Sequence, residues 1–215
     1  MIRLDIFADP VCPWCYLGKA HLDRALETRP GHPFVIEWQP FQLDPALPRG
    51  GVDRADYLLR IFGEPQRAVE AHLRLEELGR AAGVSFDFGA IRRVPNTLDA
   101  HRLIHWAGLE GRQSAMVSAL FRAYWREGRD IGDTATLAEL AGAAGLDAGA
   151  VARLFASDAD RDTIAARDRH ARERGVSAVP CFIIADHYVL SGAQPPDLWQ
   201  KVIDEIAASA GGPQG

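Results

Sequence analysis

The chain has 215 residues, of which 47% are hydrophobic and 25% are charged, and its formal net charge is −5. This composition is typical of a soluble globular protein with one large domain or two small ones, and its 3 cysteines exclude a disulfide-built secreted scaffold. No Lys/Arg-rich run supports nucleic-acid binding, no apolar run approaches a membrane span, and no signal peptide precedes the first apolar run. We therefore expect a cytoplasmic protein that binds neither nucleic acid nor membrane.

The first elements of the chain place a cysteine pair where a strand passes into a helix. The apolar run Ile2–Phe7 is rich in branched and aromatic residues and predicts a short strand. Small or apolar residues then recur at helical spacing, at Cys15, Gly18, Leu22 and Leu26. The sequence Arg29–Gly31 stops this pattern, so Cys12 and Cys15 lie at the start of the predicted helix.

This placement determines the chemistry that we expect of the two cysteines. Cys12 faces the free N–H groups and the positive dipole end of the helix, which favour its thiolate, the nucleophilic form. Two cysteines three apart can close a small disulfide ring, and we assign the resolving role to Cys15, one turn into the helix. Pro13 suits the first helical turn, where its missing N–H costs nothing. A strand, a Cys-x-x-Cys and a helix in this order predict a thioredoxin-like redox motif.

Other interpretations of the cysteines are weaker. A zinc site needs four ligands, usually as two such pairs, and the remaining Cys181 has no Cys-x-x-Cys partner, so we expect no metal site. A purely structural disulfide is disfavoured because a ring this short removes little chain entropy. Pro13 and Trp14 between the cysteines argue against chance spacing in a core. Cys181 follows Pro180 in an apolar run and is interpreted as a small buried side chain, with a third redox partner as the alternative.

Beyond the first helix the chain becomes helical. Residues Pro33–Leu43 predict a second strand, after which prolines and glycines lead into a new region. From Val52 to about Ala156, capping residues and apolar stripes at helical spacing predict about five or six helices and no strand.

Strand character returns near the end of the chain. A polar helix is predicted over Asp160–Arg174, and the runs Cys181–Ile184 and Tyr188–Leu190 predict a hairpin. Pro195 opens a final amphipathic helix. Strands at both ends of the chain around a helical middle predict an α/β domain with an all-α insertion.

These features resemble the DsbA family of thioredoxin-fold proteins, and most closely its FrnE-like branch. The resemblance is carried by the Cys-Pro-Trp-Cys motif at residues 12–15 and by Val179–Pro180 before the hairpin. Shorter similar pieces follow the same order, at Asp9–Val11, Tyr16–Lys19, Pro95–Thr97, Ala100–Leu103 and Ser191–Gln194. Their order and spacing make the resemblance specific and extend it over nearly the whole chain.

The resemblance implies a thioredoxin-like domain formed by residues 1–50 and 157–215 and interrupted by a helical insertion over residues 51–156. It implies thiol–disulfide exchange at the cysteine pair and a cis peptide bond at Pro180, which would face the cysteines. Val179 would then offer its N–H and C=O to an extended substrate, as in strand addition. Without the resemblance, a proline that simply begins a strand is the simpler interpretation of Pro180.

The surroundings of the motif contain further candidates. Asn96 and Arg102 lie where related isomerases contact substrate, although a helix cap and a surface arginine fit the sequence as well. Asp9, three residues before Cys12, either tunes the proton of that cysteine or is a solvated loop carboxylate. No spacing typical of metal ligands is found among His21, His72, His101, His105, His170 and His187.

Trp14 bears on the direction of the exchange, because strongly oxidising DsbA-type proteins have a histidine at this position. Tryptophan cannot become cationic and removes one source of thiolate stabilisation, so we expect a less oxidising pair suited to a reducing compartment. We expect a thiol- or disulfide-containing protein or small molecule as substrate and no bound cofactor, with glutathione as a candidate co-substrate. Insertion-bearing relatives suggest a homodimer.

Two other functions stay open on the sequence. A glutathione-dependent isomerase of the 2-hydroxychromene-2-carboxylate type shares the implied fold, but such enzymes typically carry serine in place of Cys12 and lack the counterpart of Cys15. A non-catalytic chaperone or peptide-binding module would use the groove beside Pro180 and the helical insertion. It would keep client binding in a Cys12→Ser variant.

Overall fold

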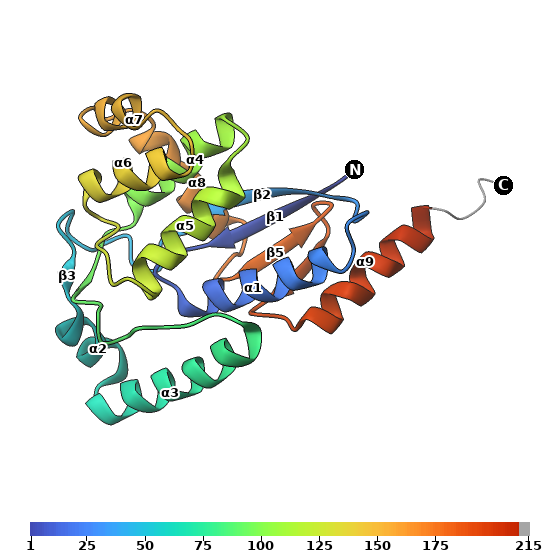
Figure 1. Cartoon of the computed structure of the whole chain (residues 1–215), viewed down its shortest axis with the longest axis horizontal. Helices are drawn as coiled ribbons and strands as arrows, with labels where there is room; N and C mark the ends of the chain where they lie inside the picture. Colours follow the sequence, from blue (N-terminus) through green and yellow to red (C-terminus); the bar gives the residue numbers. More distant parts are fainter. Residues whose placement is uncertain (211–215) are drawn as a thin grey trace.

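The computed structural model describes residues 1–210, and its main sheet has four strands in the order β2-β1-β5-β6 (Figure 1). Strand β1 (Ile2–Ala8) pairs in parallel with β2 (Phe34–Pro40) and antiparallel with β5 (Cys181–Ile184). Strand β5 forms a hairpin with β6 (Tyr188–Ser191), as the sequence predicts. The two ends of the chain therefore meet in one sheet.

The two faces of this sheet are covered by different helices. Side chains alternate between the faces along β1, as in any strand. One set packs into the core beneath α1 (Pro13–Glu27) and α9 (Pro196–Ala210) and consists of Leu4, Ile6 and Ala8. The other set faces α8 (Arg161–Glu173) and consists of Arg3, Asp5 and Phe7. The cysteine motif begins α1 and so belongs to the first face.

A block of helices lies between β2 and α8 in the sequence and covers one end of the sheet (Figure 1). Its helices are α2 (Arg54–Phe62), α3 (Pro65–Ala82), α4 (Leu98–Leu109), α5 (Gln113–Trp125), α6 (Thr134–Ala143) and α7 (Ala148–Phe155). The sequence analysis expected no strand here, but β3 (Val52–Asp53) and β4 (Arg93–Val94) form a short antiparallel pair. Two-residue strands have no periodicity, so the sequence pattern could not show them.

The boundaries of these helices follow from their local chemistry. The Asp53 carboxylate accepts N–H groups at the start of α2, and Asp133 does so at the start of α6. Pro65 is the first residue of α3, and Gly83, with φ +77°, ends it in a left-handed conformation. Capping residues of this kind are the basis for predicting helices in this region.

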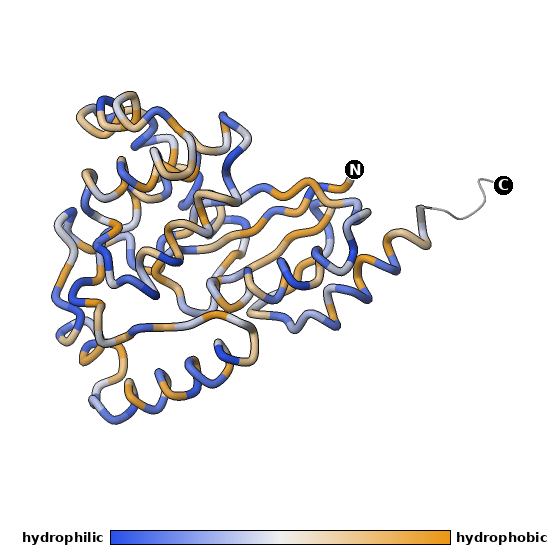
Figure 2. Tube along the Cα trace, in the orientation of Figure 1, coloured by the Kyte–Doolittle hydropathy of each residue, from blue (hydrophilic) through white to orange (hydrophobic). Residues whose placement is uncertain are grey.

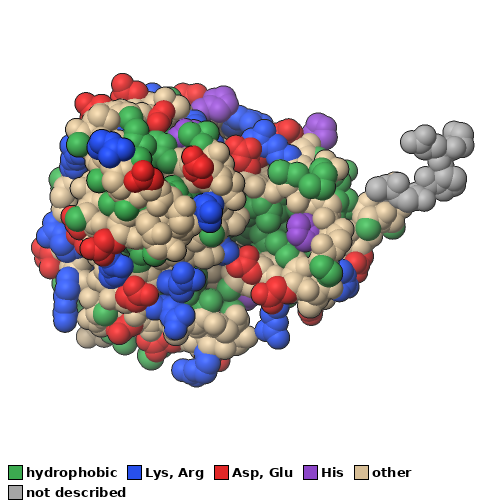
Figure 3. Space-filling model, turned by 45° about the horizontal axis from the view of Figure 1, so that its top comes forward, with side chains coloured by type: hydrophobic (Ala, Val, Ile, Leu, Met, Phe, Trp, Pro, Cys, Tyr) green, Lys and Arg blue, Asp and Glu red, His purple; other side chains and the backbone are tan. Residues whose placement is uncertain are grey.

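One cluster of buried apolar side chains extends from the sheet into the helical block. Figure 2 shows hydrophobic residues along the strands of the sheet and along the helices of the block. Its members include Leu4, Ile6, Leu103, Phe121, Leu137 and Phe155. The division of the chain at residues 51 and 156 stays a prediction, since the two parts share this core. On the face shown in Figure 3, acidic and basic side chains are interspersed. Among residues 1–210, no helix is both long enough and apolar enough to cross a bilayer.

Candidate active site

Cys12 lies at the start of α1 and caps it. Its backbone is extended (φ −91°, ψ 115°), and its Sγ accepts the main-chain N–H of Cys15 at 3.4 Å. Pro13 takes the first helical position, and the Cys12 carbonyl accepts the N–H of Tyr16 at 3.2 Å. The N–H of Cys15 is shared between this sulfur and the Cys12 carbonyl, at 3.1 Å, and the sulfur lies at the positive end of the helix, an environment that favours a thiolate.

Cys15 lies one turn further in and is 1% exposed, while Trp14 beside it is 39% exposed. Burial raises the pKa of the Cys15 thiol well above its usual value, and the neighbouring Cys12 adds to the rise. A hydrogen bond from the main-chain N–H of Asp9 opposes this shift. Both cysteines are free thiols, so the pair is in its reduced form with the inner thiol held neutral.

The segment before β5 faces the cysteines across the start of α1. The Sγ of Cys12 lies 3.7 Å from the carbonyl oxygen of Val179, and the Val179–Pro180 peptide bond is cis. The carbonyl of Pro180 accepts the N–H of Gly192, which fixes this segment to the turn after β6. A Cβ atom added to Gly18 would lie 3.0 Å from Cγ of Pro180, so α1 admits this segment because residue 18 has no side chain.

The loop between β1 and the motif is held from three sides. The carbonyl of Asp9 accepts the N–H of Cys12 at 2.9 Å, and its carboxylate accepts the N–H of Leu43 at 2.7 Å. The indole of Trp125, from α5, donates to the carbonyl of Pro10 at 3.0 Å. The helical block thus helps to position the cysteines.

Asp9 is 1% exposed, so the expectation of a solvated loop carboxylate is wrong. Its Oδ1 lies 3.6 Å from Nε2 of His101, which belongs to α4 and is 3% exposed. No sequence pattern connects these two residues, because 92 positions separate them and neither lies in a ligand motif. The available signal was a histidine in the first turn of a largely apolar helix.

The structure gives Asn96 a structural role. Its Oδ1 accepts the N–H of Leu98 at 3.0 Å at the start of α4, in agreement with the helix-cap alternative. The same oxygen accepts Nε2 of Gln42, and Nδ2 donates to the carbonyl of Leu47. Its amide group therefore ties the segment after β2 to α4 and is engaged within the protein.

Arg102 requires a correction: it is neither a surface arginine nor free to contact substrate, because it is 0% exposed. Its guanidinium donates to the carboxylate of Asp99 and to three main-chain carbonyls at and after the end of α7, those of Leu154, Ser157 and Ala159. The orphan carbonyls at the end of a helix need such donors. Arg102 thus joins α4 to α7.

Cys181 lies on the opposite face of the sheet from the cysteine pair. It is paired in register with Phe7, which faces α8, and both belong to a small buried cluster with Phe41, Ala171 and Val176. Burial raises the pKa of its thiol. This placement supports a small buried side chain rather than a third redox partner.

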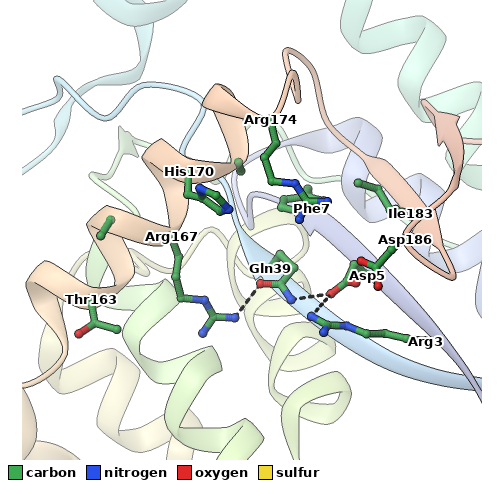
Figure 4. Close-up of a pocket in the computed structure, with 12 residues that line it drawn as sticks. Arg3, Asp5, Phe7, Gln39, Thr163, Arg167, His170, Arg174, Ile183 and Asp186 are labelled. Carbon is green, nitrogen blue, oxygen red and sulfur yellow. Dashed lines mark hydrogen bonds and ion pairs between the residues drawn. The ribbon is translucent and has the colours of Figure 1, made fainter.

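A pocket of about 590 Å³ also lies on that opposite face, between α8 and the strands β1 and β5 (Figure 4). Part of its polar lining is engaged internally: Asp5 accepts from Arg3 and Gln39, and Gln39 accepts from Arg167. Neither cysteine of the motif lines it. Within residues 1–210, no group of three or more His, Cys, Asp or Glu side chains is placed to hold a metal ion.

Comparison with known proteins agrees with this geometry. A probable DsbA oxidoreductase from Streptomyces coelicolor has a solved structure that is 31% identical, with a TM-score of 0.86 over 100% of this chain and 93% of that one. Protein YwbO of Bacillus subtilis (strain 168) is 27% identical over 205 residues, which are 95% of this chain and 96% of that protein.

A more distant structure shares the fold. The cytosolic disulfide reductase DsbM from Pseudomonas aeruginosa, solved with GSH, is 20% identical with a TM-score of 0.68 over 96% of this chain and 99% of that one. Residues 3–204 also match the family model of the DSBA-like thioredoxin domain. Both ends of the chain contribute strands to the sheet, a helical block lies between them in the sequence, and a cysteine pair begins α1. With these features, this chain belongs to the DSBA-like thioredoxin domain family.

Proposed function

We propose that the protein is a thiol–disulfide oxidoreductase in which Cys12 is the nucleophile and Cys15 resolves the mixed disulfide. The observation that carries this proposal is the position of the Cys12 sulfur. It lies between the N–H of Cys15, at 3.4 Å, and the carbonyl of Val179, at 3.7 Å. The N–H and the helix dipole favour a thiolate there, and the carbonyl belongs to a segment with which an extended substrate can pair.

The proposed cycle balances in two steps. The Cys12 thiolate attacks a substrate disulfide, forms an S–S bond to one substrate sulfur, and releases the other as a thiolate that takes up a proton. Cys15 then loses its proton and attacks the Cys12 sulfur, which releases the second substrate sulfur. The substrate disulfide is reduced by two electrons and the cysteine pair is oxidised to a disulfide.

The surface around the motif favours a substrate with apolar groups next to its sulfur. Trp14 is 39% exposed and Leu43 is 42% exposed, and Leu43 adjoins the motif through its bond to Asp9. Apolar side chains at the rim contribute affinity without demanding a particular hydrogen-bonding partner. We propose a polypeptide or a small molecule with a disulfide flanked by apolar groups.

We further propose that the pair works toward substrate reduction in a reducing compartment and that glutathione recycles it. The uncharged Trp14 supports this direction, because it supplies no cation to the Cys12 thiolate. The structure of the fold neighbour DsbM with GSH supports the choice of thiol. In this return step, two glutathione thiols are oxidised to glutathione disulfide as Cys12 and Cys15 regain their protons.

The test is an equilibrium titration in mixtures of reduced and oxidised glutathione, quenched with an alkylating agent and analysed by mass. We expect a single two-thiol transition in the wild type, lost in Cys12→Ser and in Cys15→Ser. Its midpoint should lie well below the value of about −120 mV of the strongly oxidising DsbA. A wild type that shows no transition would contradict the proposal.

Activity and binding assays on the same variants distinguish the remaining functions. A glutathione-dependent isomerase predicts a stable glutathione adduct or no change at the cysteines, and isomerase activity that persists in Cys15→Ser. A peptide-binding module predicts that Cys12→Ser binds a client as well as the wild type does, and that no disulfide forms. A reversible Cys12–Cys15 disulfide excludes neither kind of binding but establishes the exchange chemistry.

A further inference from the structure

The face of the sheet opposite the cysteine pair is only partly filled by the helix that covers it. A pocket of about 590 Å³ lies there between α8 and the strands β1 and β5 (Figure 4). A helix that packs on a sheet normally presents an apolar stripe to it. The stripe that lines this pocket has residues three or four positions apart, and only two are apolar: Thr163, Ala166, Arg167, His170, Ala171 and Arg174. Because both apolar members are alanines, the stripe leaves volume open against the strands.

The strands supply an apolar floor to this pocket. Phe7, from β1, and Ile183, from β5, both line it, and they pack in one cluster with Ala171 of α8. A cavity of this size lies within the range of about 300–1,000 Å³ that is typical of small-molecule sites. Such sites combine an apolar surface with a few polar groups that orient the ligand. The floor therefore suits an apolar ligand body.

Two of the arginines at this pocket have partners within the protein. The carboxylate of Asp5, which is 5% exposed, accepts from Arg3 at 2.8 Å and from Gln39 at 2.6 Å. Gln39 in turn accepts from Arg167 at 2.7 Å. Arg3 and Arg167 also lie 3.2 Å and 3.7 Å from the carboxylate of Glu37. This network fixes one wall of the pocket and accounts for the charges of both arginines.

Arg174 lines the same pocket without such a partner. The nearby Arg172 is paired with Asp168, but within residues 1–210 the guanidinium of Arg174 forms neither a hydrogen bond nor an ion pair. His170, one turn earlier, has its Nδ1 3.8 Å from the exposed carboxylate of Glu173. Figure 4 shows the side chains of Arg174 and His170 pointing from α8 toward the strands. A cation at the end of a helix is favourable in itself, but that does not explain the open pocket in front of it.

The charges around the pocket select the charge of its ligand. One arginine without a partner matches one negative charge, and its planar guanidinium can bind a carboxylate through two parallel hydrogen bonds. Asp5 and Asp186 also line the pocket and disfavour a second negative charge. A phosphate monoester carries about 1.5–2 negative charges at pH 7 and fits this balance less well. The pocket therefore favours a monocarboxylate.

We propose that this pocket binds a small organic monocarboxylate, whose carboxylate lies on Arg174 beside His170 and whose apolar body lies on Phe7 and Ile183. The site is separate from the site of exchange, because neither Cys12 nor Cys15 lines the pocket. The ligand is accordingly not the disulfide substrate, and its binding does not depend on the proposed exchange reaction.

The test follows backbone amide signals of the full-length reduced protein by NMR during titration with 4-phenylbutanoate. The neutral 4-phenylbutanamide has the same apolar body without the charge. The variants are Arg174→Gln and Ala166→Leu, of which the second adds volume to the pocket at an exposed position of α8. Arg169→Gln is the matched control, because Arg169 is exposed on the same helix and does not line the pocket.

We expect the wild type to bind 4-phenylbutanoate at one saturable site, with the largest shifts in α8 and in β1 and β5. Arg174→Gln should weaken this binding at least about tenfold, and the amide should bind the wild type at least about tenfold more weakly than the acid, because charge-assisted hydrogen bonds are about twice as strong as neutral ones. Ala166→Leu should abolish the saturable shifts. Arg169→Gln and Cys12→Ser should both bind as the wild type does.

Three results would overturn the proposed site. They are a wild type without saturable shifts up to the solubility limit of the acid, equal affinities for the acid and the amide, and shifts centred on the start of α1. Equal losses in Arg174→Gln and Arg169→Gln would also overturn it, since they would show attraction to the general charge of α8. If a variant fails to fold, the comparison of acid and amide on the wild type decides. A failed glutathione titration would contradict the exchange reaction and leave this result unchanged.

Discussion

The contact between Gly18 and the segment before β5 allows a sharp test of how the active site is assembled. A Cβ atom at this position would lie 3.0 Å from Cγ of Pro180, 3.4 Å from Cα of Ala193 and 3.5 Å from Cζ of Phe182. The proline ring is rigid and the second neighbour is backbone, so neither can move aside by a simple rotamer change. In Gly18→Ala the whole segment must therefore shift by a few tenths of an ångström.

Two opposing effects decide the sign of the stability change in Gly18→Ala. Alanine is favoured over glycine inside a helix by about 1 kcal/mol. Overpacking of a close-packed contact costs about 1–3 kcal/mol. We therefore expect a net loss of about 1 kcal/mol in the free energy of unfolding. The shift also moves the carbonyl of Val179 away from the Cys12 sulfur, now 3.7 Å apart, and slows the first step of exchange.

The assay combines urea unfolding of the reduced protein with the rate at which Cys12 attacks the aromatic disulfide dithiobis(nitrobenzoate), followed by the release of its coloured thiolate. Gly142→Ala is the control, because it lies in α6, far from the cysteines in the fold, and its added Cβ meets only the Cβ of Ala148, at 3.3 Å. It keeps the gain in helix propensity and should be no less stable than the wild type. If Gly18→Ala proves as stable as Gly142→Ala and exchanges at the wild-type rate, the close contact does not position the site.

Three further predictions concern charge and burial. Arg102→Met should lower the free energy of unfolding in urea by about 2–4 kcal/mol, since it leaves the carbonyls of Ser157 and Ala159 without their donor, whereas Asp99 keeps its ion pair with Arg161; a loss under about 1 kcal/mol would refute this. Burial, with a smaller effect of the Arg54 charge, lowers the pKa of His72 to about 4 from its usual 6.5. The stability that neutral His72 contributes is complete above pH 6.5 and is lost as the pH falls toward about 4. The free energy of unfolding in urea should therefore fall less over this pH range in His72→Gln than in the wild type. The same pH dependence in both proteins would contradict a lowered pKa of His72. Burial raises the pKa of Cys15 above its usual 9.0, so the stability that its neutral thiol contributes to the reduced protein is lost as the pH rises beyond that value. In folded Cys12→Ser, alkylation of Cys15 should therefore need a higher pH than in the same chain unfolded in urea. Identical pH dependences of the alkylation rate would exclude the raised pKa.

The features that the sequence could predict are those governed by near neighbours. The start of α1 follows from a strand, a cysteine that can cap and Pro13, all within a few residues. The same holds for Asp53 and Asp133, whose carboxylates accept N–H groups two or three residues on. Helix boundaries of this kind depend on hydrogen bonds between near neighbours, so the residue types and their spacing show where the helix begins.

The incorrect predictions have a different cause: each residue contacts a partner that is distant in the sequence. Arg102 was expected at the surface because a lone arginine usually is, and nothing local shows that the end of α7 supplies carbonyls to it. Asp9 was expected in solvent for the same reason, although Leu43 and His101 bury it. Pro180 was placed opposite the cysteines through family resemblance, since no spacing rule connects it to residue 12.

The helical block helps to position the candidate active site. The sheet and α1 supply the two cysteines, but the loop before them depends on residues of the block: Trp125 fixes the carbonyl of Pro10, and His101 faces the carboxylate of Asp9. The segment that carries Leu43 completes this enclosure by donating to the same carboxylate. A buried carboxylate beside a reactive thiol needs polar surroundings, and both the N–H of Leu43 and the imidazole of His101 come from outside the strand–motif–helix unit. The geometry of the motif therefore depends on the helical block as well as on the cysteines themselves.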